Sequence, residues 1–423
     1  MQSNTQMDAA MSTHEENINI KADKKICLAL MMSFIVLTLQ YVVLIAFNLI
    51  DTDIGSSIQL TSKVFVGAAF LYAFPSVFRR NGIKMIAAYS ITIAVFFMQY
   101  LMFTENREYL LDLLFPFFFI CLPAFIYAAS IRSLSILKEQ MRKTSFVILM
   151  LGILLGILIL IGKANIGTYS MSLSYYMLMP AIVFTDELIS KFSIKVLMHT
   201  MLSILIILAF GARGPLFCIL GFLFLRFLRN VFKITYRKAI LYFGICVAIP
   251  LLFFNRNIIL SVIDNLLMSV GIQSRSIQLL SQDEIALSGR EFIYDTILNQ
   301  IRDNPIHGIG IAGDRRIIGG YAHNFFLEVL SQFGLILGGI LAITVLSLII
   351  RALIVKNKNY VDMISIWVAL GFIHLMVSSS YLIDIKFWIL VGLLINKALF
   401  RYDYLSPERT SIPEEYIREV TYT

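Results

Sequence analysis

Apolar runs of about 20 residues recur along the whole chain, and they constrain its fold more than any other feature. Of the residues, 58% are hydrophobic, which exceeds what the core of a soluble protein requires. The sequence therefore predicts an all-α, polytopic integral membrane protein with about 12 transmembrane helices. The predicted spans are residues 26–47, 58–78, 83–103, 109–131, 145–162, 170–188, 194–210, 214–230, 237–254, 323–350, 361–381 and 384–400.

Two of these runs need comment. The first follows a polar stretch and has no small-residue cleavage site after it, so we expect a retained span and no cleaved signal peptide. The run at 170–188 carries several hydroxyl groups and ends in Asp186-Glu187. It could cross the membrane or lie at the interface as a half-buried helix, and losing it as a span would break the alternation of loops.

Basic residues concentrate in every second predicted loop and at both ends, as expected of cytoplasmic segments. We therefore expect both termini to be cytoplasmic, in a bacterial cytoplasmic (inner) membrane. The net charge of +8 follows from this topology and gives no reason to expect a nucleic-acid partner. The clusters are Lys21/Lys24/Lys25, Arg79/Arg80/Lys84, Arg132/Lys138/Arg142/Lys143, Lys191/Lys195, Arg226/Arg229/Lys233/Arg237/Lys238, Arg351/Lys356/Lys358 and Lys397/Arg401.

The long polar segment at 255–322 falls on the opposite side and predicts one large extracytoplasmic loop domain, partly helical. The full predicted organisation is a cytoplasmic tail at 1–25, nine spans within 26–254, this loop domain, three spans within 323–400 and a cytoplasmic tail at 401–423. All four cysteines lie within apolar runs and lack the spacing of a metal site, so they are expected to be small buried side chains.

The loop domain meets the next apolar run at Tyr321-Ala322-His323-Asn324, followed by Leu327-Glu328. Histidine, asparagine and glutamate are costly at a membrane boundary unless they are paired or used, which makes this segment a candidate site. A helix N-terminus disfavours the charged imidazolium, so His323 would stay neutral enough to accept a proton. For Glu328 the alternatives are a partner for an arginine in the site and a structural ion pair.

Two arginines are the candidate anion-binding groups. Arg290 opens a predicted helix with Ile293, Ile297 and Ile301 on one face, ended by Asn304-Pro305. On that packed face its guanidinium needs an anion, or a salt bridge to an acid such as Glu291 or Asp295. Arg213 lies in a tight outward turn, where it either anchors lipid headgroups or forms a fork for phosphate together with Arg290.

Glycines follow the predicted helix at Gly308, Gly310, Gly313, Gly319 and Gly320. Their backbone amides could face an anion, or they could form a flexible return to the membrane. Asp51-Thr52-Asp53 is similar to the acidic pair of metal-dependent membrane glycosyltransferases, but so short a match is common by chance and no metal is expected. His199 and His374 lie within spans and are interpreted as hydrogen-bonded packing residues.

The chain resembles the bacterial O-antigen ligase and polymerase superfamily over residues 190–350. The resemblance rests on Ala212-Arg213-Gly214 after an apolar helix, Ser288-Gly289-Arg290 in the outer loop, Tyr321-Ala322-His323-Asn324 with Glu328, and Phe333-Gly334-Leu335. It implies glycan substrates linked to undecaprenyl pyrophosphate at the outer face of the membrane, and transfer without a metal or other cofactor.

By the same resemblance, His323 is the predicted general base, and Arg290 and Arg213 are predicted to hold the departing pyrophosphate. Further substrate-binding candidates are Tyr321, Asn324, Glu328, Arg275, Arg315 and Arg316, and little in the sequence separates His307 from Arg275. The predicted partners are the lipid-linked glycan donor and acceptor and the membrane lipid, with a chain-length regulator and a flippase as further candidates.

The prediction is a polymerase of O-antigen or capsule repeat units. An O-antigen ligase that transfers glycan to lipid A core or protein shares the same motifs and is the first alternative. A multi-pass transporter or lipid-linked sugar flippase is the second, but it would call for charged or helix-breaking residues near the bilayer midplane and repeat symmetry between halves, and neither is evident.

Overall fold

The structure, a computed structural model, describes residues 2–50, 52–160, 171–210, 213–230 and 290–400, with five isolated positions between 261 and 269. Every regular element within these ranges is helical, which agrees with the predicted all-α class. The predicted ninth span (237–254), the first part of the predicted loop domain (255–289, apart from the five isolated positions) with Arg275, Asp51, the Arg213 side chain and the C-terminal tail (401–423) lie outside the described residues.

Six helices in the described ranges are long and apolar enough to cross a membrane, and the chain is accordingly a helical, multi-pass membrane protein. α8 (Ile194–Phe210) and α18 (Ile385–Phe400) are apolar but shorter, so the count of 12 stays a prediction. The six candidates lie in α1 (Gln2–Ala46), α2 (Asp53–Met102), η1 (Thr104–Asn106) with α3 (Arg107–Pro116), η2 (Phe117–Cys121) and α4 (Leu122–Ala129), α5 (Leu134–Leu160), α15 (Phe325–Leu353), and α16 (Lys358–Trp367) with η4 (Val368–Ile373) and α17 (His374–Val377).

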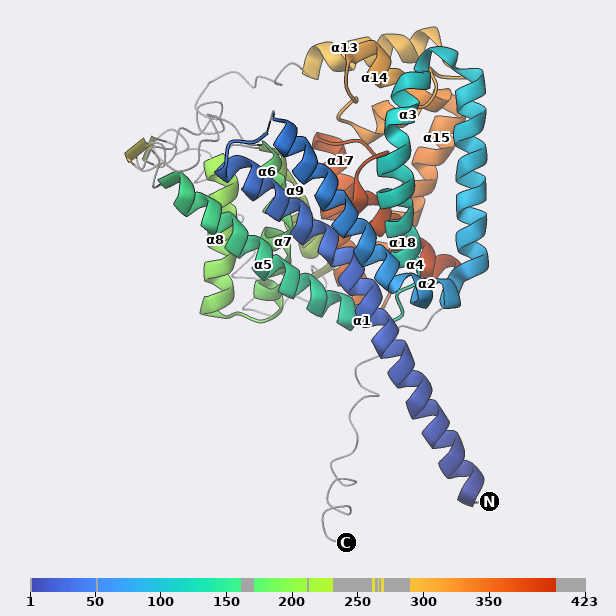
Figure 1. The fold of residues 1–423 in the computed structure, drawn as a ribbon, viewed down its shortest axis with the longest axis vertical. Helices are drawn as coiled ribbons and strands as arrows, with labels where there is room; N and C mark the ends of the chain where they lie inside the picture. The colour runs from blue at the N-terminus through green and yellow to red at the C-terminus, as the bar shows by residue number, and fades with distance from the viewer. Residues whose placement is uncertain are drawn as a thin grey trace.

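α2 is one continuous element of 50 residues that bends sharply at Asn81. A straight helix of that length would measure about 75 Å, more than twice the hydrocarbon core of a bilayer. Asn81 leaves the helical region with a φ of −141°, and its side-chain amide donates a hydrogen bond of 2.9 Å to Ser130 Oγ. The two halves therefore form a V (Figure 1), and they correspond to the predicted spans at 58–78 and 83–103.

The predicted span at 170–188 takes a different form. Residues 171–190 form two short helices, α6 (Met171–Tyr176) and α7 (Leu178–Ser190), and neither reaches the length of a span. Residues 178–186 of α7 are buried, which also argues against a half-exposed interfacial helix. The charged C-terminal part of α7 can lie inside the bundle because Asp186 is paired, with Lys138 at 2.7 Å and with Arg226 at 2.9 Å.

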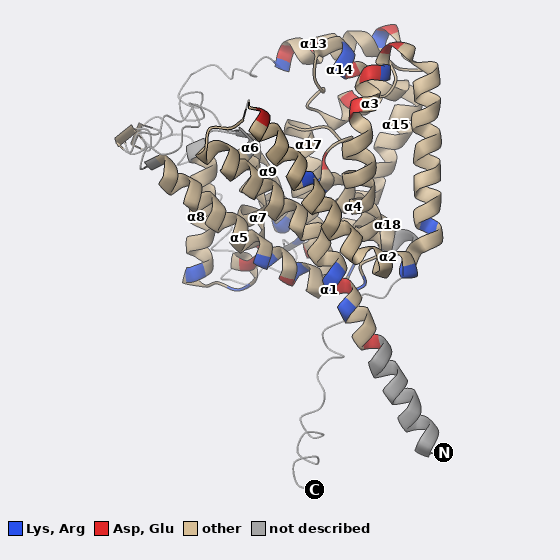
Figure 2. Ribbon diagram, viewed as in Figure 1, with Lys and Arg blue, Asp and Glu red and all other residues tan. Residues whose placement is uncertain are grey.

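The bundle has two chemically distinct ends (Figure 2). Most Lys and Arg residues gather at the lower end in that view, and a mixed group of acidic and basic residues lies at the opposite end around α3, α13 (Arg290–Asp303) and α14 (Gly313–Ile318). Contacts join the predicted cytoplasmic loops to one another: Arg80 pairs with Asp23 at 2.5 Å, and Arg229, near the end of α9 (Arg213–Asn230), bonds the Lys358 carbonyl at 3.2 Å.

Candidate functional site

The opposite end of the bundle is assembled around a segment of irregular backbone between α13 and α14. Asn106 of η1 donates through Nδ2 to the carbonyls of Ile309 and Ile311, at 2.7 and 3.2 Å. Gln99 at the end of α2 accepts a hydrogen bond from the Ile311 amide at 3.0 Å. These buried side chains satisfy backbone groups that regular structure leaves free, so they fix the segment that leads into the site.

The same segment also packs against an interruption of α15. Gly334 has φ 75° and ψ 175°, and the carbonyls that the break frees accept hydrogen bonds from the Ile309 amide (to Ser331, 2.8 Å) and the Gly310 amide (to Gln332, 3.0 Å). The amides of Gly308 and Gly313 bond the carbonyls of Asn304 and Gly310. The amides of Gly308, Gly310 and Gly313 are therefore used inside the fold, which favours the return to the membrane over anion binding for these three glycines.

His323 lies directly before α15 in an unusual conformation. Its φ of 54° is left-handed, which non-glycine residues adopt rarely and mostly at turns and functional sites. Asn324 is the N-cap of α15, and its side-chain oxygen accepts from the amides of Phe326 (3.0 Å) and Leu327 (3.3 Å). The cap explains where α15 begins, and it gives the predicted substrate-binding Asn324 a structural role.

The His323 ring is enclosed on one side by an aromatic ring. Tyr321 lies against it, with centroids 4.4 Å apart and the planes at 52°. His323 Nδ1 is buried and has no hydrogen-bond partner among the described residues. Burial, and after it the positive charge of Arg290, lowers the pKa of His323 to about 4. The ring is therefore neutral at physiological pH and can accept a proton.

Arg290 is brought to His323 by helix packing. It begins α13, which ends at Asp303 immediately before Asn304-Pro305, as predicted. Ile297 and Ile301 are buried against Ala322, just before His323, and against neighbouring side chains of α15. Both acids named as alternative partners, Glu291 and Asp295, are exposed, and within the described part of the chain no ion pair joins either to Arg290.

Beneath Tyr321 lies a buried polar group that we call the Arg315 cluster: Asp314, Arg315, Glu328, Gln332, Ser380 and Tyr381. One guanidinium serves two carboxylates, because Arg315 NH1 lies 3.3 Å from Asp314 Oδ1 and 3.8 Å from Glu328 Oε1. Arg315 also donates to Ser380 Oγ at 2.9 Å, and its guanidinium carbon lies 6.0 Å from the Tyr321 ring centroid. The cluster thus supports the Tyr321–His323 pair from below.

Hydrogen bonds close the Arg315 cluster. Ser380 donates to Glu328 Oε1, and the Tyr381 amide lies 3.3 Å from Glu328 Oε2. Tyr381 donates through its hydroxyl to Gln332 (2.6 Å), whose amide donates to Asp314 (3.1 Å). Burial raises the pKa of Asp314 even though Arg315 opposes the shift. Both predicted substrate-binding residues in this cluster, Arg315 and Glu328, are therefore engaged in holding the site together.

Arg316 is placed differently. Its NH1 lies 2.6 Å from Glu105, which is 71% exposed, and its Nε donates to Asn106 at 3.0 Å. An exposed ion pair of this kind contributes about 0–1 kcal/mol. Arg316 can exchange Glu105 for a ligand oxygen at little cost, which makes it better suited to substrate contact than Arg315.

Arg213 is the first residue of α9. The next residue, Gly214, packs against a second polar cluster, which consists of Tyr175, His374 and Asp384. A Cβ on Gly214 would lie 1.9 Å from the Tyr175 hydroxyl oxygen, so Gly214 allows a close approach. The Tyr175 ring lies 4.4 Å from that of His374, whose Nδ1 is 2.8 Å from Asp384 Oδ2. His374 is thus a paired packing residue, as the sequence indicated.

Asp384 links the Arg315 cluster to the group formed by Tyr175 and His374. The backbone amide of Asp384 donates to the carbonyl of Ser380 at 3.0 Å, and the Asp384 carboxylate lies 3.6 Å from Lys386 Nζ. Burial opposes ionisation of Asp384, but Lys386 and His374 outweigh it and hold its pKa below the usual range. Sequence reasoning missed Asp384, Asp314, Ser380 and Tyr381. The signal for Asp384 was an acid between two apolar runs, which calls for a partner.

Fold and geometry together show a multi-pass helical membrane protein with a polar, histidine-containing candidate site at one end of its bundle. Residues 199–342 match the family model described as O-Antigen ligase, a match that lies within the predicted range of 190–350 and includes Arg290, His323 and Glu328. It confirms the resemblance to the O-antigen ligase and polymerase superfamily and indicates a membrane enzyme of the glycosyltransferase type. Comparisons with curated proteins and with solved structures gave no match.

Proposed function

We propose that this protein polymerises undecaprenyl-pyrophosphate-linked oligosaccharide repeat units at the outer face of the bacterial cytoplasmic membrane. In this proposal the basic end of the bundle and both termini are cytoplasmic, and the end that carries His323 faces outward. The family match supports lipid-linked glycans as substrates. The 255–322 segment would be the extracytoplasmic domain, although only its second part is described.

The reaction requires one proton transfer and one displacement. An acceptor sugar hydroxyl forms a bond to the anomeric carbon of the donor, while the bond from that carbon to the pyrophosphate oxygen breaks. His323 takes the hydroxyl proton, and undecaprenyl pyrophosphate leaves with the bonding electrons. Arg290 and Arg213 would stabilise the charge that develops on the leaving group, a role for which planar guanidinium groups are well suited.

The observation that carries this proposal is the state of His323. A left-handed histidine whose Nδ1 has no hydrogen-bond partner among the described residues, and whose pKa is about 4, is neutral and can accept a proton. A pKa so far below neutral makes a weak base. Because Arg290 contributes to the low value, a bound pyrophosphate would offset that charge and raise the pKa of His323. The base would then strengthen only when the donor is in place.

A ligase reaction, in which finished glycan passes to lipid A core or protein, is the second candidate, favoured by the printed description of the matching family. The two reactions share donor, leaving group and base, and they differ in the acceptor. The deciding experiment is glycan laddering in a strain without the gene, complemented with the wild type or His323→Ala at matched membrane expression. Wild type should restore a ladder and His323→Ala should leave single repeat units.

Two other results would contradict the proposal. Long lipid-linked chains that accumulate without the gene identify a ligase. A ladder restored by His323→Ala excludes His323 as the base.

A further inference from the structure

Two of the basic clusters that the sequence places in cytoplasmic loops meet in the fold and line one cavity. This cavity, of about 720 Å³, lies between α5, α7 and α8 at the basic end of the bundle (Figure 2). Its volume falls within the range of about 300–1,000 Å³ that is usual for ligand sites. The charged residues that line it are Arg142 and Lys143 of α5, Glu187 of α7, Lys191 directly after α7, and Lys195 of α8.

The positive charge of this cavity is only partly neutralised by the fold. Arg142 Nε lies 3.0 Å from Glu187 Oε2, and Lys143 Nζ lies 2.6 Å from Glu139 Oε1. Lys191 and Lys195 are exposed, and neither forms an ion pair within the part of the chain that the structure describes. The cavity therefore presents two lysines to whatever occupies it, and a phosphate group is the ligand that such lysines favour.

The inner wall of the cavity is apolar and aromatic. Phe184 and Val196 are buried there. The ring of His199 lies between two phenylalanine rings, with centroids 5.0 Å from Phe184 and 5.6 Å from Phe146. His199 is thus a packing residue, as the sequence indicated, but its ring nitrogens have no hydrogen-bond partner among the described residues. A phosphate at the lysines would therefore lie beside a surface that suits the hydrocarbon part of a lipid.

The connection between α7 and α8 alternates lysines with exposed apolar side chains. Phe192 is 73% exposed and Ile194 is 63% exposed, and both lie between Lys191 and Lys195. Phe146, on the α5 wall, is 45% exposed. Apolar side chains that project beside lysines are typical of the membrane interface, where the chains enter the acyl region and the ammonium groups reach the headgroups. This arrangement favours a phospholipid over a soluble phosphate compound.

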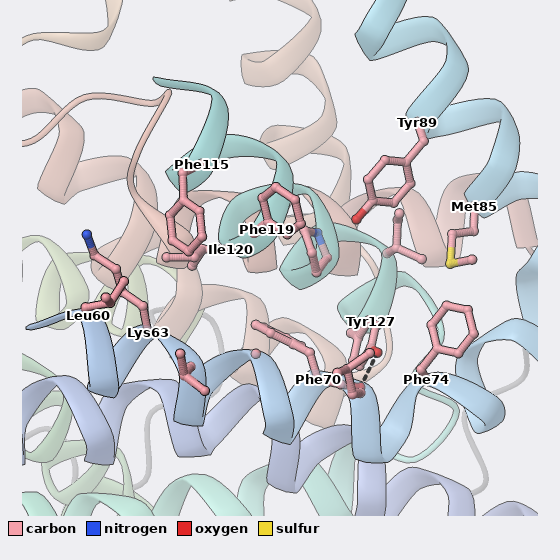
Figure 3. Close-up of a pocket in the computed structure, with 15 residues that line it drawn as sticks. Leu60, Lys63, Phe70, Phe74, Met85, Tyr89, Phe115, Phe119, Ile120 and Tyr127 are labelled. Atoms are coloured by element: carbon pink, nitrogen blue, oxygen red, sulfur yellow. Dashed lines mark hydrogen bonds between the residues drawn. The ribbon is translucent and has the colours of Figure 1, made fainter. Parts of the chain in front are cut away.

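A second cavity shows what the charge adds. It has a volume of about 440 Å³ and lies within the V of α2, where it faces η2 and α4 (Figure 3). Its lining is aromatic and aliphatic, and Lys63 is the one charged residue among the described residues that line it. Any acyl chain of the bilayer could fill such a cavity, so it identifies no ligand. The basic cavity differs because it can select a lipid by its headgroup.

We propose that the cavity between α5, α7 and α8 binds one anionic phospholipid, with its phosphate at Lys191 and Lys195 and its acyl chains beside Phe146. A headgroup such as that of phosphatidylglycerol brings a phosphate that no amine balances, and it neutralises the two lysines. Phosphatidylethanolamine brings an ammonium group as well, which the same lysines repel. The site lies at the opposite end of the bundle from His323, so the proposal does not depend on the proposed reaction.

Two pairs of lysines give a matched test. The double substitution Lys191→Gln with Lys195→Gln removes both unpaired charges from the cavity. The control is Lys356→Gln with Lys358→Gln, which removes the same charge from the same end of the bundle, where neither lysine lines the cavity. All four lysines are exposed, so both variants should fold.

Binding is measured on the full chain in phosphatidylethanolamine vesicles that contain rising fractions of phosphatidylglycerol with a diazirine beside its headgroup. Crosslinks to residues 142–147 and 191–199 should saturate as the fraction rises, whereas contact with bulk lipid rises in proportion to it. Each lysine should contribute about fivefold to the preference for an anionic headgroup. Half-saturation of the cavity variant should therefore need about 25-fold more phosphatidylglycerol, and that of the control variant should be unchanged.

Three results would overturn the proposal. Crosslinking that rises in proportion to the phosphatidylglycerol fraction would show contact with bulk lipid only. An equal loss in the control variant would show a general effect of surface charge. Displacement of the probe by glycerol phosphate in solution would show that the cavity takes a soluble phosphate compound and not a lipid.

Discussion

At the scale of single residues, the backbone and the ring of His323 point to the same conclusion. A left-handed residue costs about 1–2 kcal/mol when it is not glycine, so the surrounding structure must hold it there. The N-cap at Asn324 and the Tyr321 ring supply that support on either side. The charge of Arg290 acts on the ring and lowers its pKa, while Nδ1 has no hydrogen-bond partner among the described residues. A left-handed backbone and a buried nitrogen without a partner among the described residues are features that recur at functional sites.

Replacing His323 with asparagine tests this directly. Asparagine tolerates a left-handed backbone, so His323→Asn should keep the thermal unfolding temperature of the wild type. It cannot act as a base, and we expect transfer to fall by about 10² to 10⁴ fold. The rate is measured with purified protein in detergent and lipid-linked donor. A variant that is stable and fully active would remove His323 from the chemistry.

The pH dependence of kcat/KM gives a second test. His323 must be neutral to accept a proton, and with a pKa of about 4 it is neutral throughout the physiological range. The acid limb of the profile should therefore lie below about pH 5 in the wild type. Arg290→Gln removes a positive charge that lowers this pKa, so the acid limb should move to higher pH, while burial keeps it below the ordinary histidine value. An unmoved limb would mean that Arg290 does not act on His323.

Sequence reasoning found the ionisable residues Glu328 and Arg315 of the buried cluster, but it missed the buried residues that pair with them, Asp314, Ser380 and Tyr381. His323, Arg290 and Arg316 stand out because each is costly where the sequence places it unless it has a use. Ser380 and Tyr381 reach Glu328 from more than 50 positions away, and only the folded chain shows that pairing. A single sequence carries no signal for such a contact.

At the scale of elements, the break at Gly334 sets the direction of the first turns of α15, which carry the residues of the candidate site. Gly334 separates the buried first part, which holds Glu328 and Gln332, from a lipid-facing part. The apolar run was readable from the sequence, but the break was not, because its freed carbonyls are satisfied by Ile309 and Gly310 from a distant segment. Helix α13 was readable at its end, since Asn304-Pro305 is a local stop signal.

Gly334→Ala should destabilise the protein and loosen the site. The backbone has a φ of 75°, and a Cβ there would lie 2.2 Å from the Ile306 carbonyl oxygen, so strain and overlap act together. We expect a loss of at least about 1–3 kcal/mol in the free energy of unfolding. Gly339→Ala, in the same helix with nothing within 4 Å, should instead be neutral or stabilise by up to about 1 kcal/mol. Thermal unfolding of the two variants in one detergent makes the comparison, and equal unfolding temperatures would contradict the argument.

At the scale of the whole molecule, buried ion pairs hold the basic end of the bundle. Arg226 of α9 bonds Asp186 of α7 and Asp362 of α16, which ties together three helices that are distant in sequence. Arg226→Met would leave two buried carboxylates short of a partner and should cost about 3–5 kcal/mol. Lys143→Met, which breaks an exposed pair with Glu139, should cost about 0–1 kcal/mol.

Because Arg226 lies at the far end of α9 from Arg213, its loss should lower the unfolding temperature without changing kcat at a temperature where the variant stays folded. A specific fall in kcat with normal stability would show that the two ends are coupled.

The proposed orientation of the molecule rests on the same separation of charge, and it would decide which compartment supplies the substrates. Thr104 lies in η1 beside the candidate site, and Lys356 lies between α15 and α16 at the basic end; both are exposed. If basic loops stay in the cytoplasm, a membrane-impermeant maleimide should label Thr104→Cys in intact cells and Lys356→Cys only after permeabilisation. The unsubstituted chain is the control for its native cysteines, of which Cys27, Cys121 and Cys218 are buried. The reverse pattern would place His323 in the cytoplasm, where a donor displayed on the outer face cannot reach it, and would rule out the polymerase and the ligase together.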